Sequence, residues 1–358
     1  MTSVWIHAAL AGTLLAPAPV DKEIVSFLAR TLPDGPGGTV AVVRDGRLVH
    51  CAGFGLADRE RGTPAGCETV YDIMSITKQF TAAAIMKLQM MGKLRTTDRI
   101  SAHLGRVPAD KRAITLRHLL THTSGLGDLG DLGDDYVPVS RDTMIRRALA
   151  APLRQAPGAG FRYSNLGYSL LAAVVERASG LGYERFLATH LFAPAGMTRT
   201  GYVLPRWSPG DLAVEYDRRG RRQGRPTEHP WAKDGPYWYL RGNGGMLSTA
   251  ADMYRWHRAL EGGTVLSRRA KAEMFTPRVL TDRRERHYYG YGWGIVPRTR
   301  LGRVAEHDGG NDWSFGQYAR FTGRRVMVFW ITNQAYSTGG WNLEDLNGKL
   351  TLGLAERA

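Results

Sequence analysis

A serine and a lysine stand three residues apart at the start of a long apolar segment. The segment reads YDIMSITKQFTAAAIMKLQMMGKL (71–94) and contains Ser75 and Lys78. It predicts a buried helix from Ser75 to about Lys93, with Gly92 as a stop signal. Residues i and i+3 share a helix face, so the amine can reach the hydroxyl. A dry environment disfavours the ammonium form of lysine, and a neutral amine can take the proton of a serine. The pair therefore predicts a base-activated nucleophile; the alternative is a serine cap and a lysine that extends to water.

Two further motifs carry groups that suit acyl transfer. Tyr163 and Asn165 are two residues apart before a predicted helix, so a phenol and an amide project the same way. The phenol can pass a proton to a leaving group, and the amide can orient a substrate carbonyl or hold the lysine. The alternative is that both residues only close a turn. His307 and Gly309 form H-x-G on a predicted strand, a pattern that has weight only through its place in the order of motifs.

In this order, S-x-x-K, Y-x-N and H-x-G resemble the signature of the serine β-lactamase and penicillin-binding-protein superfamily. The class C-like branch is the most similar, and the resemblance covers about residues 21–340. Three other stretches fit that branch: LRHLLTHTSGL (116–126), GNGGMLSTAADMYRW (242–256) and YGYGW (289–293).

The resemblance implies a role for each matching residue. Ser75 would be acylated, while Lys78 and Tyr163 would manage the protons. Asn165 would contact the substrate amide, and an oxyanion would lie between the N–H groups of Ser75 and Gly310. The third motif, His307 and Gly309, would lie on the strand beside the substrate. No cofactor and no metal are implied.

One departure from the β-lactamases concerns the third motif. Those enzymes usually carry lysine there, whereas this chain has His307, which we expect to be neutral or partly charged near pH 7. The difference favours a peptidase, amidase or esterase over an efficient penicillinase. We therefore expect a serine hydrolase that acts through an acyl-enzyme. Two alternatives stay open: an acyltransferase that passes the acyl group to an amine or alcohol, and a catalytically silent ligand-binding or cell-wall-binding protein.

The elements that must position these residues indicate an α/β fold of the α+β type. Strand patterns occur near both chain ends, while the middle is mostly helical, so we expect one antiparallel sheet flanked by helices with an inserted helical domain. The expected boundaries are 21–82 plus 240–358 for the sheet domain and 83–239 for the insert. Local signals include a helix at 21–32, a hairpin turn at Asp45-Gly46, a helix at 247–263 capped by Thr249, an irregular segment at 205–240 and a final helix at about 342–356.

Composition narrows the function classes. The chain has 358 residues, is 43% hydrophobic and carries a formal charge of +15. Its basic runs, 217–225 and 281–286, lack interleaved aromatic residues and predict solvated loops, so no nucleic acid is expected. The body of the chain holds no apolar run long enough for a membrane span. Residues 1–20 suit either a secretory signal or an ordinary helix, which leaves the compartment open.

The remaining candidates for special chemistry are weak. Cys51 and Cys67 lack metal-site spacing, and we expect two free thiols, since nothing in the sequence favours a disulfide. His118 and His122 lie four residues apart but lack a third ligand, so we expect structural roles for both. For the aromatic residues of 231–239 there are two interpretations, the rim of a substrate pocket and packing within the irregular segment. We expect packing. The substrate and the oligomeric state remain open.

Overall fold

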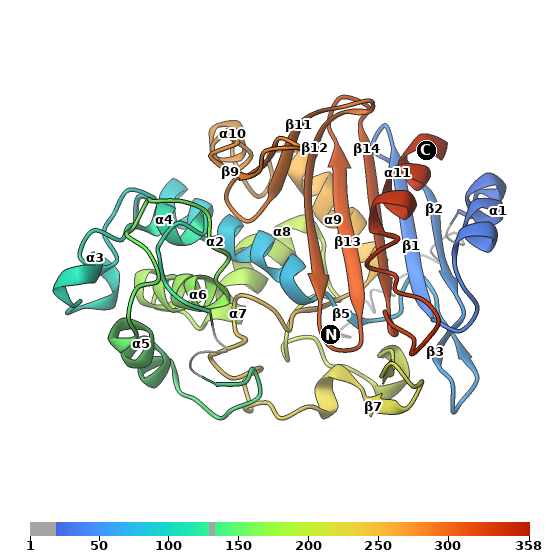
Figure 1. The fold of residues 1–358 in the computed structure, drawn as a ribbon, viewed down its shortest axis with the longest axis horizontal. Coiled ribbons are helices and arrows are strands. Elements are labelled where there is room, and N and C mark those ends of the chain that lie inside the picture. Colours follow the sequence, from blue (N-terminus) through green and yellow to red (C-terminus); the bar gives the residue numbers. More distant parts are fainter. Residues whose placement is uncertain (1–18, 129–132) are drawn as a thin grey trace, which may run out of the picture.

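A computed structural model describes residues 19–128 and 133–358. The expected leader, residues 1–20, lies almost wholly outside the described residues. The largest element is an eight-stranded antiparallel sheet with the order β2-β1-β14-β13-β12-β11-β10-β9. Its strands are β1 (Gly38–Arg44), β2 (Arg47–Phe54), β9 (Val279–Asp282), β10 (His287–Tyr289), β11 (Gly294–Thr299), β12 (Gly302–Gly310), β13 (Phe315–Phe321) and β14 (Val326–Thr332). Both ends of the chain build it, because β1 pairs with β14 (Figure 1). The predicted fold class is confirmed.

Both faces of the central strands are buried. Along β1 and β14 alternate side chains enter two separate hydrophobic cores, as the two-residue period of a strand requires. One core also holds α1 (Lys22–Thr31) and α11 (Asn347–Arg357), and the other holds α2 (Lys78–Met90) and α9 (Ala250–Glu261). The sheet is therefore a filled layer between helices, and its half formed by β9 to β12 lies toward the helical side of the molecule (Figure 1).

Between β2 and β9 the chain leaves the large sheet and forms most of the helices (Figure 1). Besides α2 and α9, these are α3 (Ser101–Leu104), α4 (Leu116–Leu120), α5 (Arg141–Ala150), α6 (Asn165–Ser179), α7 (Tyr183–Leu187), α8 (Ala193–Ala195) and α10 (Arg268–Met274). Short strand pairs connect them: β3 (Leu56–Asp58) with β4 (Thr63–Pro64), β5 (Tyr71–Asp72) with β8 (Leu247–Ser248), and β6 (Glu215–Tyr216) with β7 (Arg222–Gly224). The division at residues 82 and 240 stays a prediction.

Local sequence signals explain several of these elements. The β1–β2 hairpin turns at Asp45 and Gly46, whose φ angles of +50° and +74° suit the predicted type I′ turn. The Thr249 side chain caps α9 by accepting a hydrogen bond from Asp252 N. The last helix begins at Asn347, about five residues later than expected.

A disulfide joins Cys51 to Cys67, with the two Cα atoms 5.5 Å apart. The expectation of two free thiols is wrong. No local pattern reveals this bond, because the sulfur atoms meet only after residues 65–67 fold back across β2, where Ala65 O lies against Gly53. The bond ties β2 to the segment that leads to Ser75.

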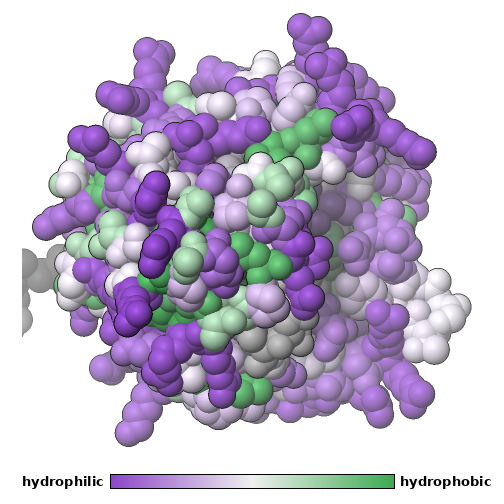
Figure 2. Space-filling model, turned by 60° about the vertical axis from the view of Figure 1, so that its left-hand side comes forward, coloured by the Kyte–Doolittle hydropathy of each residue, from purple (hydrophilic) through white to green (hydrophobic). Residues whose placement is uncertain are grey.

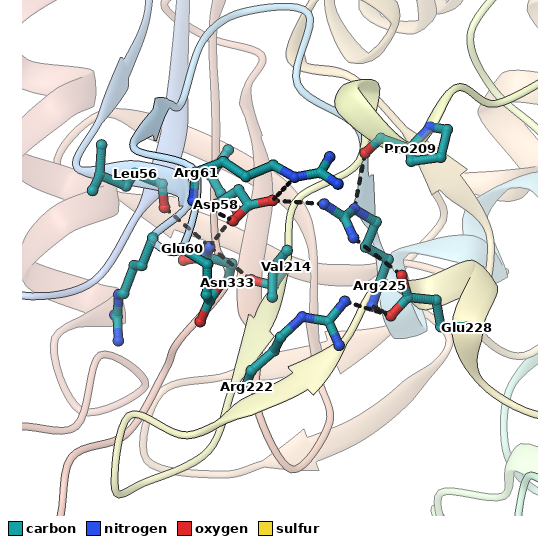
Figure 3. Close-up of polar contacts among 12 residues, drawn as sticks. Leu56, Asp58, Glu60, Arg61, Pro209, Val214, Arg222, Arg225, Glu228 and Asn333 are labelled. Carbon is teal, nitrogen blue, oxygen red and sulfur yellow. Dashed lines mark hydrogen bonds and ion pairs between the residues drawn. The ribbon is translucent and has the colours of Figure 1, made fainter.

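The irregular segment 205–240 is anchored to the sheet side through a buried ion pair (Figure 3). Arg225 Nη2 lies 2.6 Å from Asp58 Oδ2, and each side chain is only 7% exposed. Arg225 also donates to Pro209 O at 2.8 Å and pairs with Glu228 at 3.1 Å. The prediction that run 217–225 is a solvated loop is therefore wrong for Arg225.

Because of this ion pair, we expect two arginines of the basic run 217–225 to contribute unequally to the stability of the fold. Replacing Arg225 with leucine leaves the Asp58 carboxylate buried without its main partner, so we expect a loss of about 3–5 kcal/mol in the free energy of unfolding. Arg222→Leu is the matched control, because the Arg222–Glu228 pair is about 40% exposed and should contribute about 1 kcal/mol or less. Urea denaturation measures both. Equal losses in the two variants would contradict the anchoring role of Arg225.

Hydrophilic side chains cover most of the face shown in Figure 2. Among residues 19–128 and 133–358, no helix has both the length and the apolar character needed to cross a membrane.

Candidate active site

Ser75 lies on a tightly held turn, the 3-10 helix η1 (Met74–Thr77), which leads directly into α2. Met74 adopts φ +49°, a left-handed conformation that is unfavourable for a residue with a side chain. Asp72 Oδ1 accepts a hydrogen bond from Met74 N at 2.7 Å and so stabilises this turn. Pairing of β5 with β8 holds the preceding residues. The position of Ser75 is therefore set by the backbone of its own segment.

Strand β12 passes so close to this turn that Gly309 has no room for a side chain. A Cβ at that position would lie 2.7 Å from Ile73 O and 2.9 Å from Ser75 N. Glycine therefore allows the strand to run beside the backbone of the serine. The next residue, Gly310, lines the same cavity as Ser75.

Lys78 is fully buried, and its amine contacts the serine. Lys78 Nζ lies 2.8 Å from Ser75 Oγ and 2.9 Å from the carbonyl oxygen of Asn243. Burial lowers the pKa of Lys78 to about 7, although nearby carboxylates, Asp128 first among them, oppose the shift. The alternative, in which this lysine extends to water, is wrong, because the side chain is buried. Near neutral pH its amine can exist as the free base.

Tyr163 completes a compact group with these two residues. Lys78 Nζ lies 4.8 Å from the centre of the Tyr163 ring. Burial raises the pKa of the Tyr163 phenol, and a hydrogen bond with Ser75 partly offsets that rise. The phenol is therefore protonated near neutral pH and is able to donate.

The ring of His122 packs against the ring of Tyr163. The two rings are stacked with centroids 4.3 Å apart, and His122 Nδ1 accepts a hydrogen bond from Ser164 N at 3.0 Å. His118 behaves similarly, since its Nδ1 accepts from Thr115 N. Both histidines thus contact backbone N–H groups. In the part of the chain that the structure describes, no three His, Cys, Asp or Glu side chains are grouped to hold a metal ion.

Asn165 begins α6 and borders the same cavity as Ser75. Its backbone N–H donates to Asp128 Oδ1 at 3.1 Å. Its side-chain oxygen, Oδ1, is buried and has no hydrogen-bond partner among the described residues. This acceptor is available to a ligand in the cavity.

His307 is near Tyr163 but carries no charge. Its Nε2 lies 2.7 Å from Tyr289 Oη, and its Nδ1 lies 2.6 Å from the Asp308 carbonyl oxygen. The second contact requires N–H at Nδ1, so Nε2 accepts from the Tyr289 hydroxyl. Burial, with a contribution from Lys78, lowers the pKa of His307 to about 3. Of the two states expected from the sequence, neutral or partly charged near pH 7, the burial of His307 therefore favours the neutral one.

Two cavities border this group, one on the side of Ser75 and one on the side of Tyr163. The first, of about 70 Å³, includes Ser75 among its lining residues. The others are Asp72, Met74, Asp135, Tyr136, Asn165, Leu240, Asn243, Gly244, Gly245, Gly310 and Asn311. The second, of about 250 Å³, is lined by Tyr163 and His307 together with Phe161, His287, Tyr289, Glu306, Asp308 and Gln317 among others. The structure therefore brings all seven predicted site residues together. Five of them line these two cavities, Lys78 contacts Ser75, and Gly309 packs against the backbone of Ser75.

Sequence reasoning missed several residues of the site. Asn243 contributes a backbone carbonyl, which no residue type reveals. Asp135 and Tyr136 follow a stretch without any periodic pattern. Of the missed residues, Asp72 was the one that its position could have revealed, since it lies three residues before Ser75. Trp231 and Tyr239 lie outside the cavity that contains Ser75. They pack against other parts of the chain rather than within their own segment: Trp231 contacts Tyr202, and the Tyr239 hydroxyl accepts a hydrogen bond from Arg147.

Comparisons with known proteins match nearly the whole chain. The beta-lactamase family model matches residues 27–352. A penicillin-binding protein of Bacillus subtilis (strain 168) is 29% identical over 319 residues, which are 84% of this chain and 69% of that protein. Esterase EstB of Burkholderia gladioli is 29% identical over 371 residues, covering 89% of this chain and 90% of the esterase. The structure of an octameric penicillin-binding protein homologue from Pyrococcus abyssi has a TM-score of 0.76 at 27% identity, and the match covers 92% of this chain and 76% of that one.

Proposed function

The chain belongs to the beta-lactamase family of serine hydrolases, and from this premise we propose that it hydrolyses an amide, peptide or ester through an acyl-enzyme on Ser75. The contact that carries the proposal is the distance of 2.8 Å between Ser75 Oγ and Lys78 Nζ, with the lysine wholly buried. A buried amine with a pKa of about 7 is suited to accept a proton near neutral pH.

In the proposed acylation, Ser75 Oγ forms a bond to the substrate carbonyl carbon and gives its proton to the neutral amine of Lys78. The negative charge that develops on the carbonyl oxygen is accepted by the N–H groups of Ser75 and Gly310. The bond to the leaving amine or alcohol then breaks, and Tyr163 donates its proton to that group. Tyr163 is reprotonated by the ammonium of Lys78, so the net result is the transfer of one proton from Ser75 to the leaving group.

Deacylation repeats these steps with water as the nucleophile. Water gives a proton to the Lys78–Tyr163 pair and bonds to the acyl carbon, and the ester bond to Ser75 breaks. Ser75 recovers its proton, and the product is a carboxylic acid. Asn165, with an unpaired Oδ1 beside Ser75, is placed to accept a hydrogen bond from the acyl part of the substrate.

Trapping the covalent intermediate tests this function. The protein is mixed with 4-nitrophenyl acetate, quenched in acid after milliseconds to seconds, and measured as an intact mass. We expect a gain of one acetyl group, which peptide mapping assigns to the peptide that contains Ser75. Added glycinamide separates hydrolysis from acyl transfer, because only transfer yields N-acetylglycinamide. Turnover of the ester without an adduct under any quench time, or an adduct on another residue, would refute the proposal.

A further inference from the structure

The cavity that contains Ser75 is lined by hydrogen-bond acceptors rather than by cations. Asp72 and Asp135 place two carboxyl groups there, and the unpaired Oδ1 of Asn165 adds a neutral acceptor. Neither Lys nor Arg occurs among the described residues that line it. The nearest ammonium, Lys78, is already engaged with Ser75 and the Asn243 carbonyl.

Neither carboxyl group forms an ion pair with a residue that the structure describes, although Lys78 attracts Asp135 at longer range. Asp72 uses one oxygen to accept from Met74 N, and among the described residues it forms no ion pair. Asp135 likewise has no hydrogen bond or ion pair with any residue that the structure describes. Burial raises the pKa of Asp72 to about 8 and that of Asp135 to about 6. A bound cation would relieve this unfavourable burial.

The layer behind the cavity adds further negative charge. Glu215, whose side chain is 4% exposed, accepts from Asn311 Nδ2 at 3.1 Å and contacts His229 Nε2 at 2.9 Å. Asn311 itself lines the cavity. The ring of His229 is sandwiched between Tyr136 and Trp313, at 5.0 and 4.7 Å between centroids. Tyr136 therefore forms a fixed aromatic wall, and an aromatic wall also suits a cation.

The direction of the reaction decides which part of the substrate enters this cavity. Tyr163 protonates the leaving group in the proposed mechanism, and Tyr163 lines the other cavity. The leaving group therefore occupies the Tyr163 side, and the acyl part occupies the side of Ser75, Asn165 and Asp72. A volume of about 70 Å³ corresponds to a few heavy atoms, since one water takes about 30 Å³ in the liquid.

We propose that the acyl part of the substrate is small and carries a protonated amine next to the reactive carbonyl, as in an aminoacyl amide or ester, and that Asp72, Asp135 and Asn165 bind this ammonium. The inference rests on the proposed function, because it assigns the substrate of the same serine. The ammonium would donate to the two carboxylates and to Asn165 Oδ1, three acceptors that match its three N–H bonds.

Three matched substrates test the inference. Alanine p-nitroanilide carries the ammonium, N-acetylalanine p-nitroanilide carries a neutral amide in its place, and propionic acid p-nitroanilide carries hydrogen. Each alanine compound is used as both enantiomers, at pH 7.0, where an α-amino group is mostly protonated. We expect kcat/KM for one alanine enantiomer to exceed that of the propionyl compound by about 10- to 100-fold, as for hydrogen bonds to charged groups.

Variants of the carboxyl groups assign the preference to residues. Asp135→Asn and Asp72→Asn should each lower the alanyl-to-propionyl ratio of kcat/KM by about tenfold or more. Asparagine at position 72 keeps an oxygen that can accept from Met74 N. Asp345→Asn, at an exposed position outside the cavity, makes the same charge change and should leave the ratio as in the wild type.

The outcomes separate this inference from the proposed function. Equal kcat/KM for the alanyl and propionyl compounds, with Ser75 still acylated by 4-nitrophenyl acetate, would overturn the ammonium site and leave the hydrolase standing. A preference that survives both Asp72→Asn and Asp135→Asn would also overturn it. Failure of every ester and anilide to acylate Ser75 would instead refute the proposed function.

Discussion

Replacing Ser75 with alanine is expected to reduce kcat/KM for 4-nitrophenyl acetate by about 10⁵-fold or more, because removal of an activated nucleophile eliminates the acyl-enzyme route. The fold should persist. Ser75 Oγ has Lys78 and Tyr163 as its side-chain hydrogen-bond partners, and the strained turn is held by Asp72 and by the close approach of Gly309. Stopped-flow release of 4-nitrophenolate measures the effect. Fluorophosphonate labelling, read by intact mass, should fall to zero in the same variant.

Ser26→Ala is the matched control for this experiment. Ser26 is exposed on α1, and its one hydrogen bond to a described residue is to the Lys22 carbonyl in the same helix, so the same chemical change there should leave the rate unaltered. A Ser75→Ala variant that keeps more than about a hundredth of the wild-type rate would contradict a serine nucleophile, since that residual is far above what its removal leaves.

The parts of the fold that were predictable depend on local chemistry. The turn at Asp45-Gly46 follows from two residues that tolerate positive φ, and the start of α9 follows from the Thr249 cap. Alternating strand patterns at both chain ends were enough to predict a sheet built from both termini. These signals lie within a few residues of one another, so the sequence displays them directly.

Features that depend on distant segments were not predictable. Cys51 and Cys67 are 16 residues apart with no motif, and only the course of the chain across β2 brings them together. The burial that keeps His307 neutral, and the hydrogen bond that occupies its Nε2, come from Tyr289 and neighbouring strands. Asp135 reaches the cavity beside Ser75 from a stretch with no periodic pattern. The motif residues Ser75, Lys78 and Tyr163 were identified from order and spacing, whereas their surroundings were not.

Lys78→Met is expected to reduce kcat/KM by about 10²- to 10⁴-fold, the usual contribution of a positioned general base. Methionine has a similar length and suits the dry surroundings of Lys78, which is fully buried. Lys87→Met is the matched control, because Lys87 lies on the same helix and also donates to a backbone carbonyl, that of Val265. That variant should retain the wild-type rate.

The pH profile gives this prediction a second measurement. Burial lowers the pKa of Lys78 to about 7, so the ammonium form prevails below that pH and the neutral base above it. The wild-type kcat/KM for a neutral ester should therefore rise with pH, with a midpoint near 7. Asp72 and Asp135 titrate in the same cavity, with pKa values of about 8 and about 6, and both remain in the variant. A limb that disappears in Lys78→Met belongs to the lysine, and one that persists belongs to the carboxyl groups. If the variant kept both the rate and the limb, Lys78 would not be the base, and the 2.8 Å contact with Ser75 Oγ would have only a structural role.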